Sequence, residues 1–299
     1  MSKNRGETMI VTVTSPLNGA GKSLTTINYA TLFVKALNER VLIINNHKDK
    51  DDIAYYLSNA TLTKGLDEFK NMTSGNLIKS SKGLKSCVSR VHDSIDIMAT
   101  NNCLDLNERD ISYLLDLANK EYGLIIIDTP YDKRSITKEV LNLADSILMV
   151  LEPNQKSLYH LKHNELFINK KNNVVYVLNK VLDRFDSVKS NKTSYSIEKT
   201  LTKAVKDKDR VYCLDYDMYL NNECNDHTVL NYILGSKFDS TNYMKNLLDL
   251  LDYTVNNHSD KFLDITRIRE KKEFIVKRIL KSVNYIKNND TEAIAIENN

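Results

Sequence analysis

Short apolar segments alternate with segments of helical periodicity from Met9 to Leu178. The strand-like segments, rich in β-branched and aliphatic residues, are Met9–Thr14, Arg40–Asn45, Ser94–Ala99, Leu124–Asp128, Ser146–Leu151 and Val174–Leu178. The helical segments are Lys22–Asn38, with Ile27, Ala30, Thr31 and Val34 on one face, Glu108–Lys120 and Ser157–Asn169. This alternation predicts an α/β fold, a doubly wound and mainly parallel sheet of about seven strands with helices on both faces.

The rest of the chain is less regular. Weaker helical periodicity appears at Ile53–Leu57, Leu66–Phe69, Ser196–Val205 and Tyr243–Tyr253, and Arg210–Leu214 fits an edge strand. A last amphipathic helix is expected at Ile268–Ile286, before a frayed tail. We therefore expect one main domain over residues 1–255 and a basic helical extension with a tail over residues 256–299.

Composition limits the class of protein. Apolar runs such as Leu124–Ile127 are too short to span a bilayer, and the polar segment Met1–Thr8 is unlike a signal peptide, so a cytoplasmic location is expected. The net charge of +3 does not by itself indicate binding to nucleic acid. The cysteines form no CxxC pair, which favours reduced structural thiols over a zinc or disulfide framework: Cys87, Cys103, Cys213 and Cys224.

A glycine-bearing loop, Gly19-Ala20-Gly21-Lys22-Ser23, joins the first strand to the first helix. In this context backbone N–H groups and the helix dipole bind phosphate. The glycines permit close approach of the backbone, Lys22 can reach the β- and γ-phosphates, and the Ser23 hydroxyl can bind Mg²⁺. The general pattern GxxxxGK[ST] has glycine where this chain has Pro16, so the strand and helix on either side carry much of the prediction.

Asp128 ends the most apolar strand of the sequence. A buried carboxylate is costly without a cation or hydrogen-bond donors, and ligands of parallel sheets bind at the carboxyl ends of the strands. We therefore expect Asp128 to help hold Mg²⁺. The alternative is that Asp128 caps the next helix or the turn before Pro130.

The chain resembles the ParA/MinD group of deviant Walker A ATPases. The resemblance rests on LNGAGKSLTTINYA, RVLIIN, YGLIIIDTP, LADSILMVLEP and VVYVLNK, which follow one another in the family's order between residues 9 and 235. The segments LADSILMVLEPNQKSLYHLK, VLNKV and YSIEKTL look like the CpaE/TadZ branch of that group. The resemblance implies that residues 1–255 form a nucleotide-binding domain with the P-loop NTPase fold, and it implies the cofactors ATP and Mg²⁺.

The same resemblance implies roles for particular residues. Lys22 and Asp128 would be catalytic, and Ser23 and Asp128 would hold the magnesium ion. The expected nucleotide contacts are Asn18, Gly19, Ala20, Gly21, Lys22, Ser23, Leu24 and Asn179. Asn179 falls where the family reads the adenine edge, and Leu182 stands where a guanine-reading NKxD motif needs aspartate, so ATP is favoured over GTP.

The chain departs from the family at the positions tied to hydrolysis. The signature lysine, which reaches the partner's nucleotide across a dimer, falls at Leu17, and the next glycine falls at Asn18. The family's DxD after the second strand falls at Asn45 and His47, so both carboxylates are replaced. A surface position is favoured for His47 over a catalytic one. We therefore expect weak ATP hydrolysis, if there is turnover.

The loop TSPLNGAGKS also resembles the TSxxPGxGKS loop of bacterial tyrosine kinases, which share this fold. That family has an Asp-rich motif after the second strand and a tyrosine-rich tail. Here the strand ends in IINNHKD, and the segment from Tyr285 onward holds one tyrosine. A kinase is therefore the less favoured alternative.

Positive charge is concentrated near the end of the chain. Between residues 261 and 289 there are nine Lys or Arg and three Asp or Glu, which gives a local charge of +6. This helix is expected to bind DNA without sequence specificity, to lie on an anionic membrane, or only to pack on the domain.

Three functions stay open: an ATP switch that positions DNA or a cellular machine, a nucleotide-holding scaffold without turnover, and a tyrosine-kinase-like phosphotransferase. The switch would act as a homodimer with an unidentified protein partner, in the cytoplasm or at the nucleoid or membrane.

Overall fold

The computed structural model describes residues 8–47, 52–58, 64–100, 106–132, 134–163, 173–182, 189–205 and 210–265. The chain divides into two compact units, Met1–Phe262 and Leu263–Asn299, and the sheet with its covering helices belongs to the first. The helix predicted at Ile268–Ile286, with the basic segment 261–289 beyond residue 265, lies outside the described residues. Among the described residues, no helix combines the length and apolar character needed to cross a bilayer.

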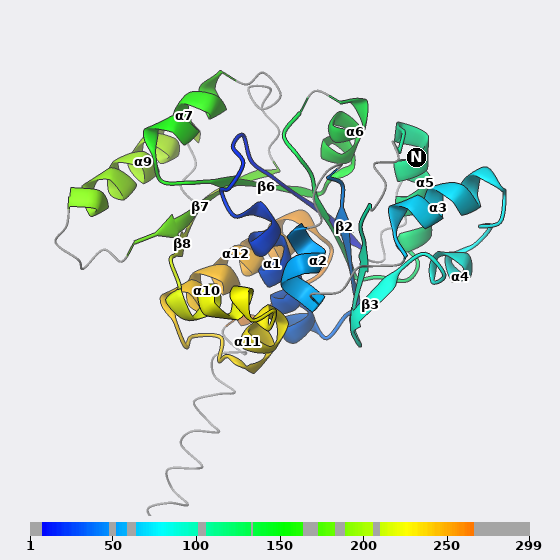
Figure 1. Ribbon diagram of the computed structural model, residues 1–299. Helices are drawn as coiled ribbons and strands as arrows, with labels where there is room; N and C mark the ends of the chain where they lie inside the picture. The colour runs from blue at the N-terminus through cyan, green and yellow to red at the C-terminus, as the bar shows by residue number, and fades with distance from the viewer. Residues whose placement is uncertain are drawn as a thin grey trace, which may run out of the picture. The chain divides into compact units, whose positions relative to one another are not determined.

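An eight-stranded sheet forms the centre of this unit, in the order β3-β4-β2-β5-β1-β6-β7-β8 (Figure 1). The strands are β1 (Met9–Thr14), β2 (Val41–Asn45), β3 (Ser89–His92), β4 (Ile95–Met98), β5 (Leu124–Asp128), β6 (Ser146–Leu151), β7 (Val174–Val181) and β8 (Val211–Asp215). Every pairing is parallel except that of β3 with β4. The predicted parallel sheet is confirmed, with β8 at its edge, whereas the short, polar strand β3 was not predicted.

Helices cover both faces of the sheet (Figure 1). One face carries α1 (Lys22–Leu37), α11 (Val229–Gly235) and α12 (Asn242–His258), with α2 (Asp52–Ser58) and α10 (Met218–Asn225) beside them. The helices associated with the other face are α3 (Leu66–Ser74), α4 (Ser81–Leu84), α5 (Glu108–Ala118), α6 (Ser135–Leu143), α7 (Gln155–Lys162) and α9 (Lys189–Val205). The fold is therefore doubly wound, as the alternation of strands and helices predicts.

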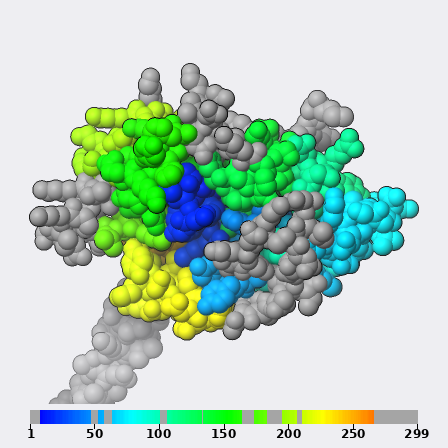
Figure 2. Space-filling model, turned by 45° about the horizontal axis from the view of Figure 1, so that its top comes forward, coloured from blue at the N-terminus to red at the C-terminus, as the bar shows by residue number. Residues whose placement is uncertain are grey.

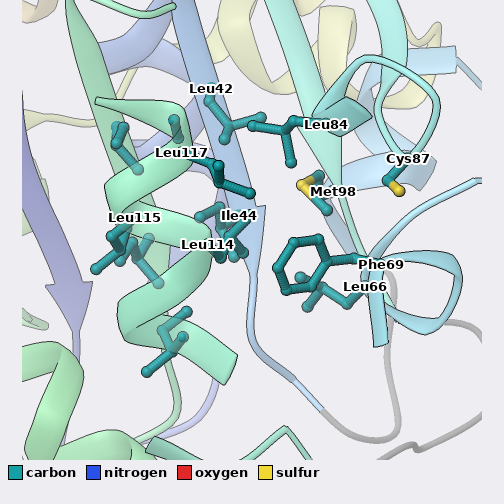
Figure 3. Packing of buried hydrophobic residues seen from close by; sticks show 14 of the residues in the cluster. Leu42, Ile44, Leu66, Phe69, Leu84, Cys87, Met98, Leu114, Leu115 and Leu117 are labelled. Atoms are coloured by element: carbon teal, nitrogen blue, oxygen red, sulfur yellow. The ribbon is translucent and has the colours of Figure 1, made fainter. Parts of the chain in front are cut away.

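The larger apolar cluster lies between the sheet and α3, α4 and α5 (Figure 3). Ile44 of β2 lies beside Leu114 of α5, Leu42 of β2 lies near Leu84 of α4, and Phe69 of α3 lies near Met98 of β4. Each of these side chains is fully buried, which stabilises the fold by about 1.5–3 kcal/mol per residue. This packing fixes β2, β4 and β5 side by side, and it is the ends of β2 and β5 that carry polar side chains.

Helix α1 differs from the one-sided helix that its periodicity predicts. Besides the expected face, Thr25, Thr26, Asn28 and Tyr29 are also buried. The reason is that α1 packs against the sheet and also against α11 and α12. Two of its buried polar side chains pair with α12: Asn28 Nδ2 donates to the Tyr243 hydroxyl, and the Tyr29 hydroxyl pairs with that of Thr254. The helix that follows the glycine-bearing loop is thus anchored on several sides.

Candidate functional site

The loop after β1 has the backbone shape of a phosphate cradle. Gly19 and Gly21 have φ angles of +81° and +91°, in the left-handed region that side chains other than glycine avoid. Gly21 is also the N-cap of α1, so the helix begins directly at Lys22. The N-terminal N–H groups of a helix lack partners within the helix and attract anions.

Asp128 lies at the carboxyl end of β5 and is fully buried. The Ser23 hydroxyl donates to its Oδ2 at 2.6 Å, and Nε2 of His47 lies 3.1 Å from its Oδ1. Both carboxylate oxygens therefore have a partner, one from the start of α1 and one from the segment after β2. The first contact unites the two residues predicted to hold magnesium.

His47 is half-buried, whereas a surface position was expected. Its side chain is 21% exposed and pairs with Asp128. The cause lies in the sheet: β2 and β5 are neighbours, and Asn45 is in register with Asp128, so the chain leaving β2 passes the carboxylate. Asn46 follows, and its backbone N–H donates to the Asp128 carbonyl oxygen at 2.9 Å.

Arg134 lies beside this strand end, at the N-cap of α6. Its Nε donates to Asp132 at 2.6 Å, and its Nη2 lies 3.4 Å from the Asn46 carbonyl oxygen. Burial acts to raise the pKa of Asp132, but hydrogen bonds from Thr137 and Arg134 outweigh it and hold that pKa below its ordinary value. An ionised Asp132 thus fixes a guanidinium group next to the segment that carries His47.

On the other side of the loop, β7 supplies Asn179 and Lys180. Asn179 Nδ2 donates to the Ala20 carbonyl oxygen at 2.9 Å, and Lys180 Nζ donates to the Gly19 carbonyl oxygen at 2.7 Å. Lys180 also pairs with Glu152, just after β6, at 3.0 Å. A Cβ atom at Gly21 would lie 2.2 Å from Asn179 Nδ2, so this close approach requires glycine. One amide bond to the loop leaves Asn179 a second N–H and its oxygen for other partners.

The predicted site residues gather at one edge of the sheet. The loop residues 18–24 follow β1, Asp128 ends β5, and Asn179 lies near the carboxyl end of β7; these strands are parallel members of one sheet. Asn18 and Gly19 are exposed, Ser23 and Leu24 are half-buried, and Lys22 is buried. In Figure 2 the blue N-terminal segment reaches the surface between green segments from the middle of the chain and the yellow helices α10 and α11.

The residues at this edge fit a magnesium nucleotide. A hydroxyl and a carboxylate, from Ser23 and Asp128, are the oxygen donors that Mg²⁺ prefers, with the remaining positions filled by water and phosphate. Within the described residues no three His, Cys, Asp or Glu side chains gather into a metal-binding group. A site of this kind therefore depends on the nucleotide for part of its oxygen donors.

The contacts of three residues near the site were not predicted from the sequence. His47 pairs with Asp128, Glu152 with Lys180, and Arg134 with Asp132. For Lys180 the signal was present, because it follows Asn179 in an Asn-basic dipeptide after a strand. The contact of His47 with Asp128 depends on strand order, whereas Arg134 and Asp132 are only two residues apart in the chain. Among the described residues, Cys87, Cys213 and Cys224 form no disulfide, and burial raises the pKa of Cys87.

Comparison with known proteins places the fold. No family model and no curated protein matched the chain. A ParA family ATPase from Chlorobium tepidum is 18% identical, with a TM-score of 0.65 over 81% of this chain and 98% of that one. A putative plasmid partition protein of Borrelia burgdorferi, bound to AMPPNP, is 20% identical, with a TM-score of 0.60 over 84% and 99%.

The septum site-determining protein MinD of Pyrococcus horikoshii, complexed with Mg-ADP, is 11% identical, with a TM-score of 0.60 over 83% of this chain and 96% of that one. At these identities the likeness concerns the fold. The chain has the α/β fold of ParA and MinD ATPases, with the sheet edge that follows β1 and β5 as its candidate nucleotide site.

Proposed function

We propose that this chain binds ATP with Mg²⁺ and acts as a ParA/MinD-like nucleotide switch in spatial positioning. The observation that carries the proposal is the 2.6 Å hydrogen bond between Ser23 and Asp128 directly below a loop with two left-handed glycines. That pair brings the two magnesium-holding groups of a P-loop site together from positions far apart in the sequence. The likeness to partition and MinD proteins supports the class of function.

Each residue of the site then has a role. Lys22 would neutralise phosphate charge, and the backbone of Asn18 to Leu24 would supply N–H donors. Ser23 and Asp128 would hold Mg²⁺, which neutralises charge on the phosphates when bound. Asn179 would contact the adenine edge with the amide groups that its bond to Ala20 leaves available.

Slow hydrolysis is part of the proposal. Leu17 cannot supply the cation that the family's signature lysine gives, and Asn45 cannot accept a proton from water. His47, at the second position of that motif, is directed to Asp128 by its 3.1 Å contact. Turnover slower than about one per second is expected. The contact of His47 with Asp128 also supports the second candidate function, a scaffold that holds ATP without turnover.

The task of the switch is proposed from the class alone. Partition of plasmid or chromosome DNA and localisation of a surface or secretion machine, as in the CpaE/TadZ branch, both require ATP-dependent self-association in the cytoplasm. The basic segment 261–289 would then bind DNA or anionic lipid. Size-exclusion chromatography with and without ATP, repeated with DNA and with vesicles of anionic lipid, separates these tasks from a scaffold that stays monomeric.

The nucleotide proposal is tested by calorimetry with a non-hydrolysable ATP analogue and Mg²⁺. Lys22→Ala is expected to weaken binding by at least about tenfold, since it removes a charge-assisted contact to phosphate. Unchanged affinity would refute the assignment of the loop. Steady ATP turnover above about one per second would refute the slow-hydrolysis claim, and labelled tyrosines would instead favour the kinase alternative.

A further inference from the structure

We propose that Lys180 is a positioning residue for the phosphate loop. Its ammonium group, held by Glu152, binds the Gly19 carbonyl oxygen, while Asn179 binds that of Ala20. Together the two side chains form a clamp on the outer side of the loop. The inference rests on the proposed nucleotide function and adds to it a residue that acts through the loop backbone.

The backbone of β7 explains how two consecutive side chains reach one loop. In a regular strand neighbouring side chains point to opposite faces. Here the register between β7 and β8 shifts between Leu178 and Val181, and Lys180 has a φ of +60°. Such a bulge re-aims side chains within a strand. It lets Asn179 and Lys180 both turn toward the loop, which a strand without the bulge would not allow.

Binding the carbonyl oxygens orients the opposite side of each peptide group. In a trans peptide the C=O and the N–H of the same unit point in opposite directions. The Gly19 carbonyl belongs to the unit that carries the Ala20 N–H, and the Ala20 carbonyl to the unit that carries the Gly21 N–H. No cis peptide occurs in the described residues. The clamp therefore turns these two N–H groups away from Lys180 and Asn179, toward the side on which a phosphate is expected.

The competing explanation is that the ion pair of Lys180 with Glu152 only stabilises the fold. The small contribution expected of such a pair argues against this explanation. The side chains of Lys180 and Glu152 are 45% and 32% exposed. Ion pairs as exposed as this contribute little to the free energy of folding. The position of the ammonium group is nevertheless specific, because it joins the end of β6 to the loop after β1. Loss of Lys180 should therefore be felt in the loop and in nucleotide binding more than in unfolding.

The experiment uses the full chain and compares Lys180→Met with Lys120→Met. Both substitutions remove one exposed charge and keep an aliphatic side chain, and Lys120 lies before β5, at the opposite end of that strand from Asp128. Calorimetry measures the affinity for ATP·Mg²⁺ and ADP·Mg²⁺. Hydrogen–deuterium exchange of peptides covering residues 15–24 reports on the loop in the protein without nucleotide.

We expect Lys180→Met to lower the affinity for both nucleotides by about three- to tenfold, the range for a partly exposed charged hydrogen bond. Exchange in residues 15–24 should be faster, with a melting temperature like that of Lys120→Met. Lys180→Arg, which keeps charge and donors, should recover most of the affinity. If Lys180→Met matches Lys120→Met in affinity and exchange, the clamp is refuted. If the unsubstituted chain binds neither nucleotide, the proposed function fails, and loop exchange alone then decides on the clamp.

Discussion

Two buried carboxylates of the same sheet, Asp96 and Asp128, lie near opposite ends of their parallel strands and have different surroundings. Asp96, near the start of β4, is 1% exposed and accepts hydrogen bonds from Arg40, from Arg90 at 3.2 Å and from the Tyr122 hydroxyl at 2.8 Å. Asp128, at the end of β5, is also buried, but its partners are the hydroxyl of Ser23 and the imidazole of His47.

The difference concerns how each charge is compensated. A buried carboxylate requires a cation or several donors to offset the loss of hydration. At Asp96 two guanidinium groups supply permanent positive charge. At Asp128 the imidazole is charged only when it is protonated. The first arrangement is complete within the protein, and the second leaves a role for a bound cation. We therefore expect substitution of Asp96 to change mainly the free energy of unfolding, and substitution of Asp128 to change mainly the Mg²⁺-dependent affinity for ATP.

The largest effect on stability is expected for Asp96→Ala. This change leaves Arg40 and the Tyr122 hydroxyl without the acceptor that they share. The Arg40 guanidinium also lies over the Tyr122 ring, 4.9 Å from its centroid, so both groups are held close to the vacated position. Because the arginines can partly turn to solvent, we expect a loss of about 2–3 kcal/mol in the free energy of unfolding. Urea unfolding measures it. A loss equal to that of a surface substitution would end the distinction between the two sites.

Asp128→Asn should have the opposite profile. The amide keeps the shape of the side chain and removes a buried charge, so the unfolding free energy without Mg²⁺ should stay unchanged or rise by up to about 1 kcal/mol. The Mg²⁺-dependent affinity for ATP should fall about 10- to 100-fold, as for other groups that orient a metal site. Calorimetry at several Mg²⁺ concentrations tests this. An equal fall in affinity without Mg²⁺ would show that Asp128 acts on the loop and not on the metal.

The two edges also differ in how much of them the sequence predicts. The bounds of β1, β5 and β6 were predicted to the residue, because strands buried on both faces are continuous apolar runs with sharp ends. The end of β5 therefore marked Asp128, and the loop after β1 marked Ser23. Their contact follows because both lie at the carboxyl edge of adjacent strands.

Other parts depend on information that no local pattern contains. His47 meets Asp128 because β2 lies next to β5, an order that periodicity does not reveal. Lys180 reaches the loop through a bulge in β7. The strand β3 has only four, mostly polar residues, and α6 begins at Ser135 after the N-cap residue Arg134, whose side chain makes no capping hydrogen bond. Short elements and strand neighbours are set by packing, so they appear only in the folded chain.

Tyr122→Phe should have the smallest effect and gives the finest test of the comparison. Burial, and next the hydrogen bond to Asp96, raise the pKa of Tyr122 above its ordinary value. A raised phenol pKa in the folded chain stabilises the fold below the unfolded pKa of about 10, and this contribution is lost as pH rises beyond it. Phenylalanine has no proton to lose, so stability should decline less steeply above pH about 10 than in the unsubstituted chain.

Near neutral pH the same substitution should cost about 1–1.5 kcal/mol, the loss of one hydrogen bond to a charged acceptor that keeps its arginine partners. Urea unfolding measured from neutral to alkaline pH gives both quantities. Tyr113→Phe is the matched control, since its hydroxyl donates at 2.8 Å to the Ile78 carbonyl oxygen and not to a carboxylate. If both substitutions change the decline of stability with alkaline pH equally, the hydrogen bond to Asp96 is not what distinguishes Tyr122. The charge of Asp96 would then be compensated by Arg40 and Arg90 alone.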